Sequence, residues 1–164
     1  MSRWTRRLAG AGLAAGLLLA CPSAQATETT LFLSYSTPTN IWGWGVGGDL
    51  SFSFLKFGMF GVEGAHQRSP AFQTPINYLT VQALLVLPVR KLRLYGGVGA
   101  GLFYESASAV TQSDFGSLSA LILGAKLKVH DILVLKVEYR RYGLTGEPPL
   151  ALQQRFSMGA GLVF

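Results

Sequence analysis

The sequence predicts an all-β fold, an eight-stranded antiparallel up-and-down transmembrane β-barrel that follows a cleaved signal peptide. Three observations predict this fold. The chain has 164 residues, enough for one domain, and only 13% of them are charged, against about 25% in an average soluble protein. Beyond the first 26 residues, apolar and polar residues alternate along short segments that turn signals separate. No later segment has the roughly 20 apolar residues of a membrane helix, and a closed barrel is the other structure that satisfies its backbone inside lipid.

The N-terminal segment has the three parts of an export signal. Three arginines begin the chain without any acidic residue, an apolar run follows from Leu8 to Cys21, and Ala24-Gln25-Ala26 offers a small-residue cleavage site. We therefore predict a signal peptide over residues 1–26 and a barrel domain over residues 27–164. Because three of the 14 basic residues belong to the signal, 11 basic residues remain against 8 acidic ones. We see no clustered basic face of the kind that binds nucleic acid.

Cys21 is the only cysteine of the chain, so no disulfide can form within it. Leu18-Leu19-Ala20-Cys21 also fits a bacterial lipobox, which would make Cys21 the lipidated first residue of the mature protein. The alternative is that Cys21 is removed with the signal peptide, and we favour it because the Ala-x-Ala site lies just downstream. Arg6-Arg7 could indicate twin-arginine export, but a barrel must travel unfolded, which argues against that route.

Eight segments after the signal have the composition of β-strands, and most have the 9–11 residues of a tilted membrane strand. They are Glu28–Ser36, Trp44–Phe54, Phe57–Gln67, Asn77–Leu87, Leu92–Tyr104, Leu118–Lys128, Ile132–Tyr142 and Gln154–Phe164.

The connections between these segments alternate between long and short. Residues 37–43, 68–76, 105–117 and 143–153 form long connections, whereas residues 55–56, 88–91 and 129–131 form tight ones. Transmembrane barrels have short periplasmic turns at one end and longer extracellular loops at the other. We therefore expect both ends of the barrel domain on the short-turn side, where the last strand ends on Phe164.

Alternation within each strand separates an apolar face from a face of glycine, serine and charge. We expect the polar face inside, because the interior of an eight-stranded barrel is just wide enough for side chains and glycine relieves crowding there. Buried charges need partners, so we predict a network of ion pairs in the lumen. Its members are Asp49, Glu63, Arg93, Lys126, Lys128, Lys136, Glu138, Arg140 and Arg155.

Aromatic residues gather near the predicted strand ends, which is typical of the girdles at the two membrane interfaces. Those near the long loops are Tyr35, Trp42, Trp44, Tyr78, Tyr104 and Tyr142, and those near the short turns are Phe54, Phe57 and Phe164.

Three segments carry a resemblance to a known family: Arg93–Tyr104, Leu135–Tyr142 and Phe156–Phe164. Their glycine-rich middle strand, the late Glu-Tyr-x-x-Tyr and the terminal aromatic resemble OmpA/OmpX-type eight-stranded outer-membrane barrels. The resemblance implies a Gram-negative cell outer membrane as the location, with outer-membrane lipid, lipopolysaccharide and the barrel-assembly machinery as partners. It also implies that the assembly signal consists of Phe156, Met158, Ala160, Leu162 and Phe164.

Because this family includes structural proteins, adhesins and lipid-modifying enzymes, its fold does not settle function. Deacylase members use a His-x-Ser pair on a late strand, and Glu138–Thr145 contains neither residue type. Glu63, His66 and Ser69 could supply an orienting carboxylate, a base and a nucleophile, but strand alternation turns His66 away from the other two.

Two further patterns also lack the context that their chemistry needs. His130 beside Asp131 offers too few ligands for a metal ion. Gly43-x-Gly45-x-x-Gly48 matches a dinucleotide fingerprint but has no βαβ unit around it. We therefore predict no catalytic residue, no cofactor-binding site and no metal site.

These observations predict a non-enzymatic, monomeric outer-membrane barrel with a structural or surface-interaction role. The alternatives are a lipid-A-modifying enzyme, a narrow pore and, outside the membrane, a soluble binding barrel. Arg141 shares the parity of the lipid-facing residues and lies near the outer interface. It is a candidate contact for the phosphates of lipopolysaccharide, with snorkelling to the headgroup level as the alternative.

Overall fold

The structure is a computed structural model that describes residues 24–37, 40–52, 57–68, 75–105, 114–144 and 153–164. Residues 1–23 of the predicted signal peptide, with Cys21, lie outside these ranges, so the signal stays a prediction. Within the described part of the chain, we find no helix with the length and apolar character needed to cross a membrane. The strands are β1 (Ala24–Thr37), β2 (Ile41–Phe52), β3 (Gly58–Arg68), β4 (Pro75–Val89), β5 (Leu92–Glu105), β6 (Asp114–His130), β7 (Leu133–Leu144) and β8 (Gln154–Val163).

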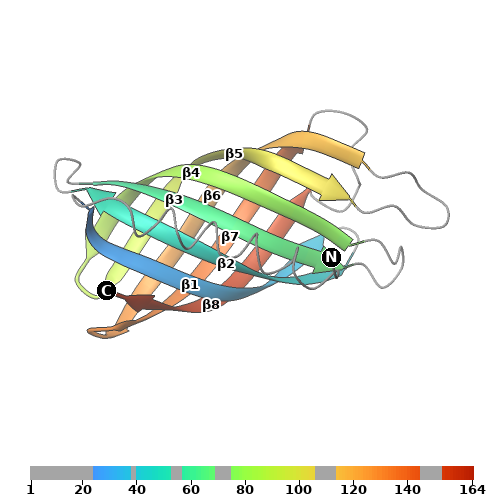
Figure 1. The fold of residues 1–164 in the computed structure, drawn as a ribbon. Coiled ribbons are helices and arrows are strands. Elements are labelled where there is room, and N and C mark those ends of the chain that lie inside the picture. The colour runs from blue at the N-terminus through green and yellow to red at the C-terminus, as the bar shows by residue number, and fades with distance from the viewer. Residues whose placement is uncertain (1–23, 38–39, 53–56, 69–74, 106–113, 145–152) are drawn as a thin grey trace, which may run out of the picture.

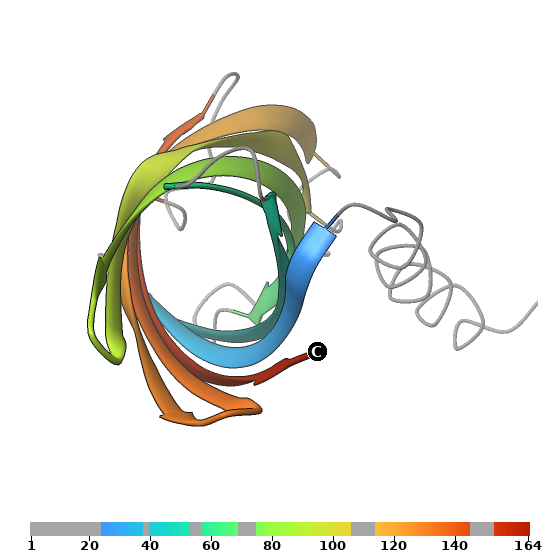
Figure 2. The same cartoon turned by 90° about the vertical axis from the view of Figure 1, so that its left-hand side faces the viewer.

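The eight strands form one closed antiparallel barrel, which confirms the predicted fold class and strand number. Each strand pairs with the next one along the chain, and β8 returns to pair with β1 through a ladder that runs from Glu28↔Val163 to Thr37↔Gln154. Figure 2 looks along the barrel and shows the closed ring. Because the ring closes, each described strand has a paired neighbour on both sides, and none lies at an open edge of the sheet.

The predicted strands all exist, but the expected alternation of connection lengths fails at the first connection. Residues 37–43 were expected to form a long connection, whereas β1 continues to Thr37 and β2 already begins at Ile41. A local turn explains the difference. Asn40 adopts a left-handed backbone with φ of 53°, its side chain accepts a hydrogen bond from the Tyr35 hydroxyl, and the Tyr35 ring packs on Trp42 with centroids 5.0 Å apart. The second connection, expected over residues 55–56, lies outside the described residues, between β2, which is described to Phe52, and β3, which begins at Gly58.

The two faces of the barrel wall follow the predicted parity. In β8, Phe156, Met158 and Leu162 are exposed on the outside, whereas Arg155 and Ser157 are buried inside. Inward glycines make room for inward aromatic rings, as expected in so narrow an interior. Phe32 lies between Gly45 and Gly159 on the neighbouring strands, and Tyr95 lies against Gly124.

The prediction of aromatic girdles was wrong for two residues. Tyr78 and Tyr142 are buried in the barrel interior, with ring centroids 5.9 Å apart, because they share the inward parity of their strands. Trp42, Trp44, Tyr104, Phe57 and Phe164 are exposed, as a girdle requires, and Tyr35 is half-buried. Phe54 lies outside the described residues.

The tight turns and the end of the chain lie at the same end of the barrel. Figure 1 shows the C-terminus at the same end of the barrel as the β4–β5 and β6–β7 turns, and the backbone N–H of Val163 donates to the carbonyl of Ile132 in the β6–β7 turn at 3.1 Å. We call this end of the barrel the turn end.

Candidate functional site

The centre of the barrel holds an ion-pair network built around Arg140 of β7. Its guanidinium is fully buried and lies 2.6 Å from a Glu63 carboxylate oxygen and 2.5 Å from one of Glu138. The same group donates to the side-chain oxygens of Gln82, at 2.7 Å, and Thr80, at 3.3 Å. The planar guanidinium therefore joins three strands, β3, β4 and β7, through hydrogen bonds to charged and polar partners.

Arg155 of β8 shares the carboxylates of Arg140 and adds an aromatic surround. It lies 2.8 Å from Glu63 and 3.1 Å from Glu138, and it donates to the Tyr78 hydroxyl. Its guanidinium carbon lies 4.9 Å from the centre of the Phe32 ring, 5.5 Å from that of Tyr78 and 6.0 Å from that of Tyr142. Cation–π attraction at these distances stabilises a cation that has left water.

Two lysines complete the network around Tyr95. Lys136 lies 3.0 Å from Glu138, which also accepts a hydrogen bond from the Tyr95 hydroxyl at 2.9 Å. Lys126 lies 2.7 Å from Asp49 and 2.8 Å from Glu28. Both ammonium groups lie within 6 Å of the Tyr95 ring centre, at 5.7 Å for Lys126 and 5.9 Å for Lys136.

Charges balance within the described interior. The buried acidic residues are Glu28, Asp49, Glu63 and Glu138, and the buried basic residues are Lys126, Lys136, Arg140 and Arg155. Four carboxylates thus face four cations. Removing charges from water is costly unless each one finds a partner, and this interior supplies a partner for every one of them.

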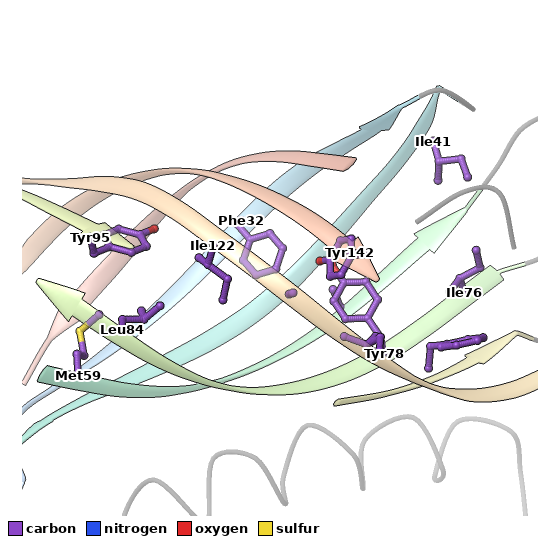
Figure 3. Close-up of a cluster of buried hydrophobic side chains, with 13 residues drawn as sticks. Phe32, Ile41, Met59, Ile76, Tyr78, Leu84, Tyr95, Ile122 and Tyr142 are labelled. Carbon is purple, nitrogen blue, oxygen red and sulfur yellow. The ribbon is translucent and has the colours of Figure 1, made fainter. Parts of the chain in front are cut away.

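Buried apolar side chains also lie in the interior towards both ends of the barrel. Figure 3 shows Met59 and Leu84 towards one end of the barrel, with Ile41 and Ile76 towards the other. All four are almost completely buried. Beside Ile41 and Ile76, the buried side chain of Gln67 donates to the Ser36 hydroxyl at 3.0 Å, so this end of the interior combines apolar and polar groups.

The structure places seven of the nine predicted lumen charges in this network: Asp49, Glu63, Lys126, Lys136, Glu138, Arg140 and Arg155. The other two lie nearer the turn end. Lys128 is partly exposed and pairs with Asp131 at 2.9 Å, and Arg93 shares the inward parity of Tyr95 but is only half-buried. Glu28 also belongs to the network but was not predicted, although its parity, opposite to that of the outward Leu31, indicates an inward position.

The residues considered for catalysis are not brought together. Glu63 faces the lumen, whereas His66 lies on the outward parity of β3, where its Nδ1 is 2.8 Å from the Asn77 side-chain oxygen and its ring is 5.9 Å from that of Trp44. Ser69 lies outside the described residues. Gly43 and Gly45 lie within β2. In the described ranges, no group of three or more His, Cys, Asp or Glu side chains is placed to hold a metal ion.

The outer wall carries Arg141 close to an apolar groove. Arg141 is exposed and pairs with Gln154 of β8 and Leu121 of β6 in the backbone ladders. Two residues away on the same face, Tyr139 packs on Phe156 with centroids 5.0 Å apart. Both rings line a groove of about 650 Å³ that also contacts Leu33, Trp42, Leu123 and Met158.

Comparisons with known proteins agree with this architecture. The family described as the outer membrane protein beta-barrel domain matches residues 9–164. No curated protein sequence matched the chain. Among solved structures, the chain is similar to outer membrane protein H (OprH) of P. aeruginosa, with a TM-score of 0.67 and 15% identity over 85% of this chain and 100% of that one.

Two further structures show the same fold. Neisserial surface protein A (NspA) has a TM-score of 0.61 and 12% identity over 84% of this chain and 93% of that one. The N-terminal β-barrel domain of Pseudomonas aeruginosa OprF has a TM-score of 0.61 and 15% identity over 86% of this chain and 98% of that one.

Proposed function

Because the chain belongs to the outer membrane protein β-barrel domain family, we propose that it is a non-enzymatic barrel that spans the outer membrane without conducting. Its signal peptide is cleaved on export, its turn end faces the periplasm, and its longer loops face outward. The wall then serves as a structural element of the membrane, and the loops and outer rim serve for interaction at the surface.

The filled interior is the observation that carries this proposal. Four buried carboxylates and four buried cations bond to one another across the lumen, and apolar side chains lie beyond them at both ends. Opening a water path would separate ion pairs such as Arg140 and Glu63, which are 2.6 Å apart. Breaking such a buried pair costs about 3–5 kcal/mol. We therefore expect a barrel whose closed state is dominant.

Planar-bilayer recording of the protein purified from membranes tests the proposal directly. The expected result is no unitary conductance above that of the lipid alone. Regular conductance steps in the wild-type protein would contradict a closed barrel and favour the narrow pore. As a positive control, Arg140→Gly should produce openings, because it removes the central guanidinium and leaves space in its place.

The rival enzymatic function has a separate test. The opposite orientation of Glu63 and His66 argues against the dyad that a hydrolase would need. Incubation of the purified protein with lipopolysaccharide, followed by mass analysis of lipid A, is expected to show unchanged acyl chains and phosphates. A new lipid A species that depends on the protein would overturn the non-enzymatic proposal.

We further propose that Arg141 contacts a phosphate of lipopolysaccharide, with an acyl chain in the neighbouring groove. The exposed guanidinium lies two residues from Tyr139, which lines the apolar groove, so a headgroup and a chain of one lipid could reach both. Arg141→Gln is expected to reduce the lipopolysaccharide that co-purifies with the barrel. Unchanged co-purification would leave Arg141 as a residue that only snorkels to the interface.

The outward face of β8 is proposed to be the assembly signal. Its members are all exposed along one side of the last strand and its end: Phe156, Met158, Ala160, Leu162 and Phe164. Phe164→Ser is expected to lower the amount of folded barrel in the membrane of growing cells while leaving the refolding yield of the purified chain unchanged. Equal losses in cells and in refolding would show that Phe164 acts on stability instead.

A further inference from the structure

The turn end of the barrel carries a cluster of basic side chains that the interior network does not use. Arg90 and Lys91 form the β4–β5 turn, and Lys128 and His130 lie at the end of β6. Arg90, Lys91 and His130 are exposed, and Lys128 is partly exposed. We call these four residues the basic rim.

The two turns that carry the basic rim are physical neighbours. The backbone N–H of Lys128 donates to the carbonyl of Lys91 at 2.9 Å. Figure 2, which faces this end, shows the β4–β5 and β6–β7 hairpins side by side, in yellow-green and orange. Residues that are about forty positions apart in the sequence are therefore held on one surface.

One acidic side chain, Asp131, accompanies the basic rim, and it is already engaged. Its carboxylate lies 2.9 Å from the Lys128 ammonium. The hydrogen bond from Lys128, together with the positive charges of Lys128, His130 and Lys91, lowers the pKa of Asp131. Among the described side chains, Arg90, Lys91 and His130 are left without an acidic partner, so we expect this surface to attract anions.

Arg90 adds an observation from the backbone. Its φ is 56°, in the left-handed region that glycine occupies most readily. At the other left-handed position, Asn40, the side chain closes the turn by hydrogen bonding to Tyr35. Arg90 makes no side-chain hydrogen bond or ion pair with the described residues, and its exposed side chain lies at the tip of the turn.

The position of the basic rim relative to the apolar outer wall indicates which kind of anion it binds. Val89 precedes Arg90, Val129 precedes His130 and Ile132 follows Asp131, and all three apolar side chains are about half exposed. The apolar outer wall therefore reaches the turns themselves, and the cations begin where it ends. In a membrane this is the depth of the lipid headgroups, where guanidinium and ammonium groups meet phosphates.

We propose that the basic rim binds the phosphate-bearing headgroup of an anionic phospholipid in the leaflet that contacts the turn end. The site rests on the proposed membrane location and orientation of the barrel. Basic groups that bind a polymer in the aqueous space would project beyond the membrane, whereas Arg90 and His130 follow directly on the exposed apolar residues Val89 and Val129 of the outer wall. The observations therefore favour lipid over a soluble anionic polymer.

Native mass spectrometry of the protein purified from membranes tests the site. The protein is placed in mixed micelles with equal amounts of phosphatidylglycerol and phosphatidylcholine of the same acyl chains, and the retained lipids are counted. The wild-type protein is expected to retain phosphatidylglycerol in preference. A cation close to an anionic lipid surface contributes a factor of about five in affinity, so Lys91→Glu is expected to lower the preference at least about fivefold.

Two matched variants make the result specific. Arg68→Glu makes the same charge change at the opposite end of the barrel, where Arg68 is exposed, and is expected to leave the preference unchanged. Asp131→Asn removes the competing carboxylate, frees Lys128 and is expected to raise the preference. Equal losses in Lys91→Glu and Arg68→Glu would refute a local site, because the effect would then follow net charge alone.

Additional measurements distinguish an anionic lipid from other anionic ligands. Excess inorganic phosphate is expected not to displace the lipid. Displacement by phosphate would overturn the lipid site and leave a simple anion site. If Lys91→Glu leaves the lipid preference intact but weakens capture on isolated peptidoglycan, the partner is the polymer and the proposal fails. Heat-modifiable mobility and insertion into phosphatidylcholine vesicles are measured in parallel, since their loss would refute the membrane barrel itself.

Discussion

Replacing Arg140 tests whether the buried network holds the barrel together. In the native protein its guanidinium lies within 2.6 Å of carboxylates of both Glu63 and Glu138, and no part of the side chain reaches solvent. Arg140→Gln removes one of the four buried cations and leaves four buried carboxylates. The uncompensated charge cannot leave the lumen without separating the strands.

The magnitude follows from the burial of the pair. Breaking a buried ion pair by removing one partner costs about 3–5 kcal/mol. With urea slopes of about 1–3 kcal/mol per molar, a loss of this size lowers the unfolding midpoint by at least about 1 M. The assay is urea unfolding of the barrel in lipid vesicles, followed by tryptophan fluorescence, because Trp42 and Trp44 are exposed on the outer wall.

The neighbouring residue provides the matched control. Arg141 has the same side chain one position along β7 but is exposed on the outside. Arg141→Gln is expected to change the free energy of unfolding by less than about 0.5 kcal/mol, as surface substitutions usually do. Similar midpoint shifts in Arg140→Gln and Arg141→Gln would refute the argument that the network stabilises the fold.

A double variant separates lost charge balance from lost volume. Arg140→Gln combined with Glu63→Gln leaves three carboxylates and three cations in the described interior. The combined destabilisation is expected to be smaller than the sum of the single effects by roughly 1–3 kcal/mol, which is the range for contacting residues. Strict additivity would contradict direct coupling between these two side chains.

Two further predictions follow from local packing and from the turn end. Gly124→Ala is expected to lower the free energy of unfolding by about 1–3 kcal/mol, because the added Cβ would overlap the Tyr95 ring. The control is Gly64→Ala, whose Cβ would lie 4.0 Å from its nearest neighbour, and this variant should be tolerated in the same urea assay. The pKa of Asp131 is lowered in the folded barrel, so its pairing with Lys128 persists above the usual carboxyl pKa and is lost as the pH falls through the lowered value. In the Lys128→Gln variant, NMR titration should show that the pKa of Asp131 rises towards that of the unfolded chain. An unchanged pKa would contradict the pairing of Asp131 with Lys128.

The faces of the strands were predictable because strand parity has a period of two and both faces have distinct compositions. Once Phe156, Met158 and Leu162 define the outside of β8, Arg155 must face inward, and the structure has it there. The same rule would have placed Tyr142 inside, since it shares the parity of Arg140. Its position near a strand end suggested a girdle, and parity was the better guide.

The partners within the interior could not be derived from the sequence. Arg140 and Glu63 are 77 positions apart and lie on strands that are not neighbours in the ring, so their contact depends on strand tilt and register throughout the barrel. The connection between β1 and β2 also depended on local geometry. The left-handed backbone of Asn40 allows a shorter turn there than the composition of residues 37–43 indicated. Parity gives the side of the wall on which a residue lies, and register decides what it meets.

The barrel has buried charges at its centre and exposed charges at its turn end, and added salt should affect the two differently. The four buried carboxylates and four buried cations cancel, so the excess of 11 basic over 8 acidic residues beyond position 26 lies outside this network. Buried pairs are screened little by ions, whereas exposed charges are screened over about 8–10 Å at physiological ionic strength. Raising the salt concentration should therefore weaken the lipid preference of the basic rim while leaving the contribution of Arg140 to stability almost unchanged. If the destabilisation caused by Arg140→Gln fell with added salt in parallel with the lipid preference, the central network would have to be accessible to ions, and a closed lumen could not be maintained.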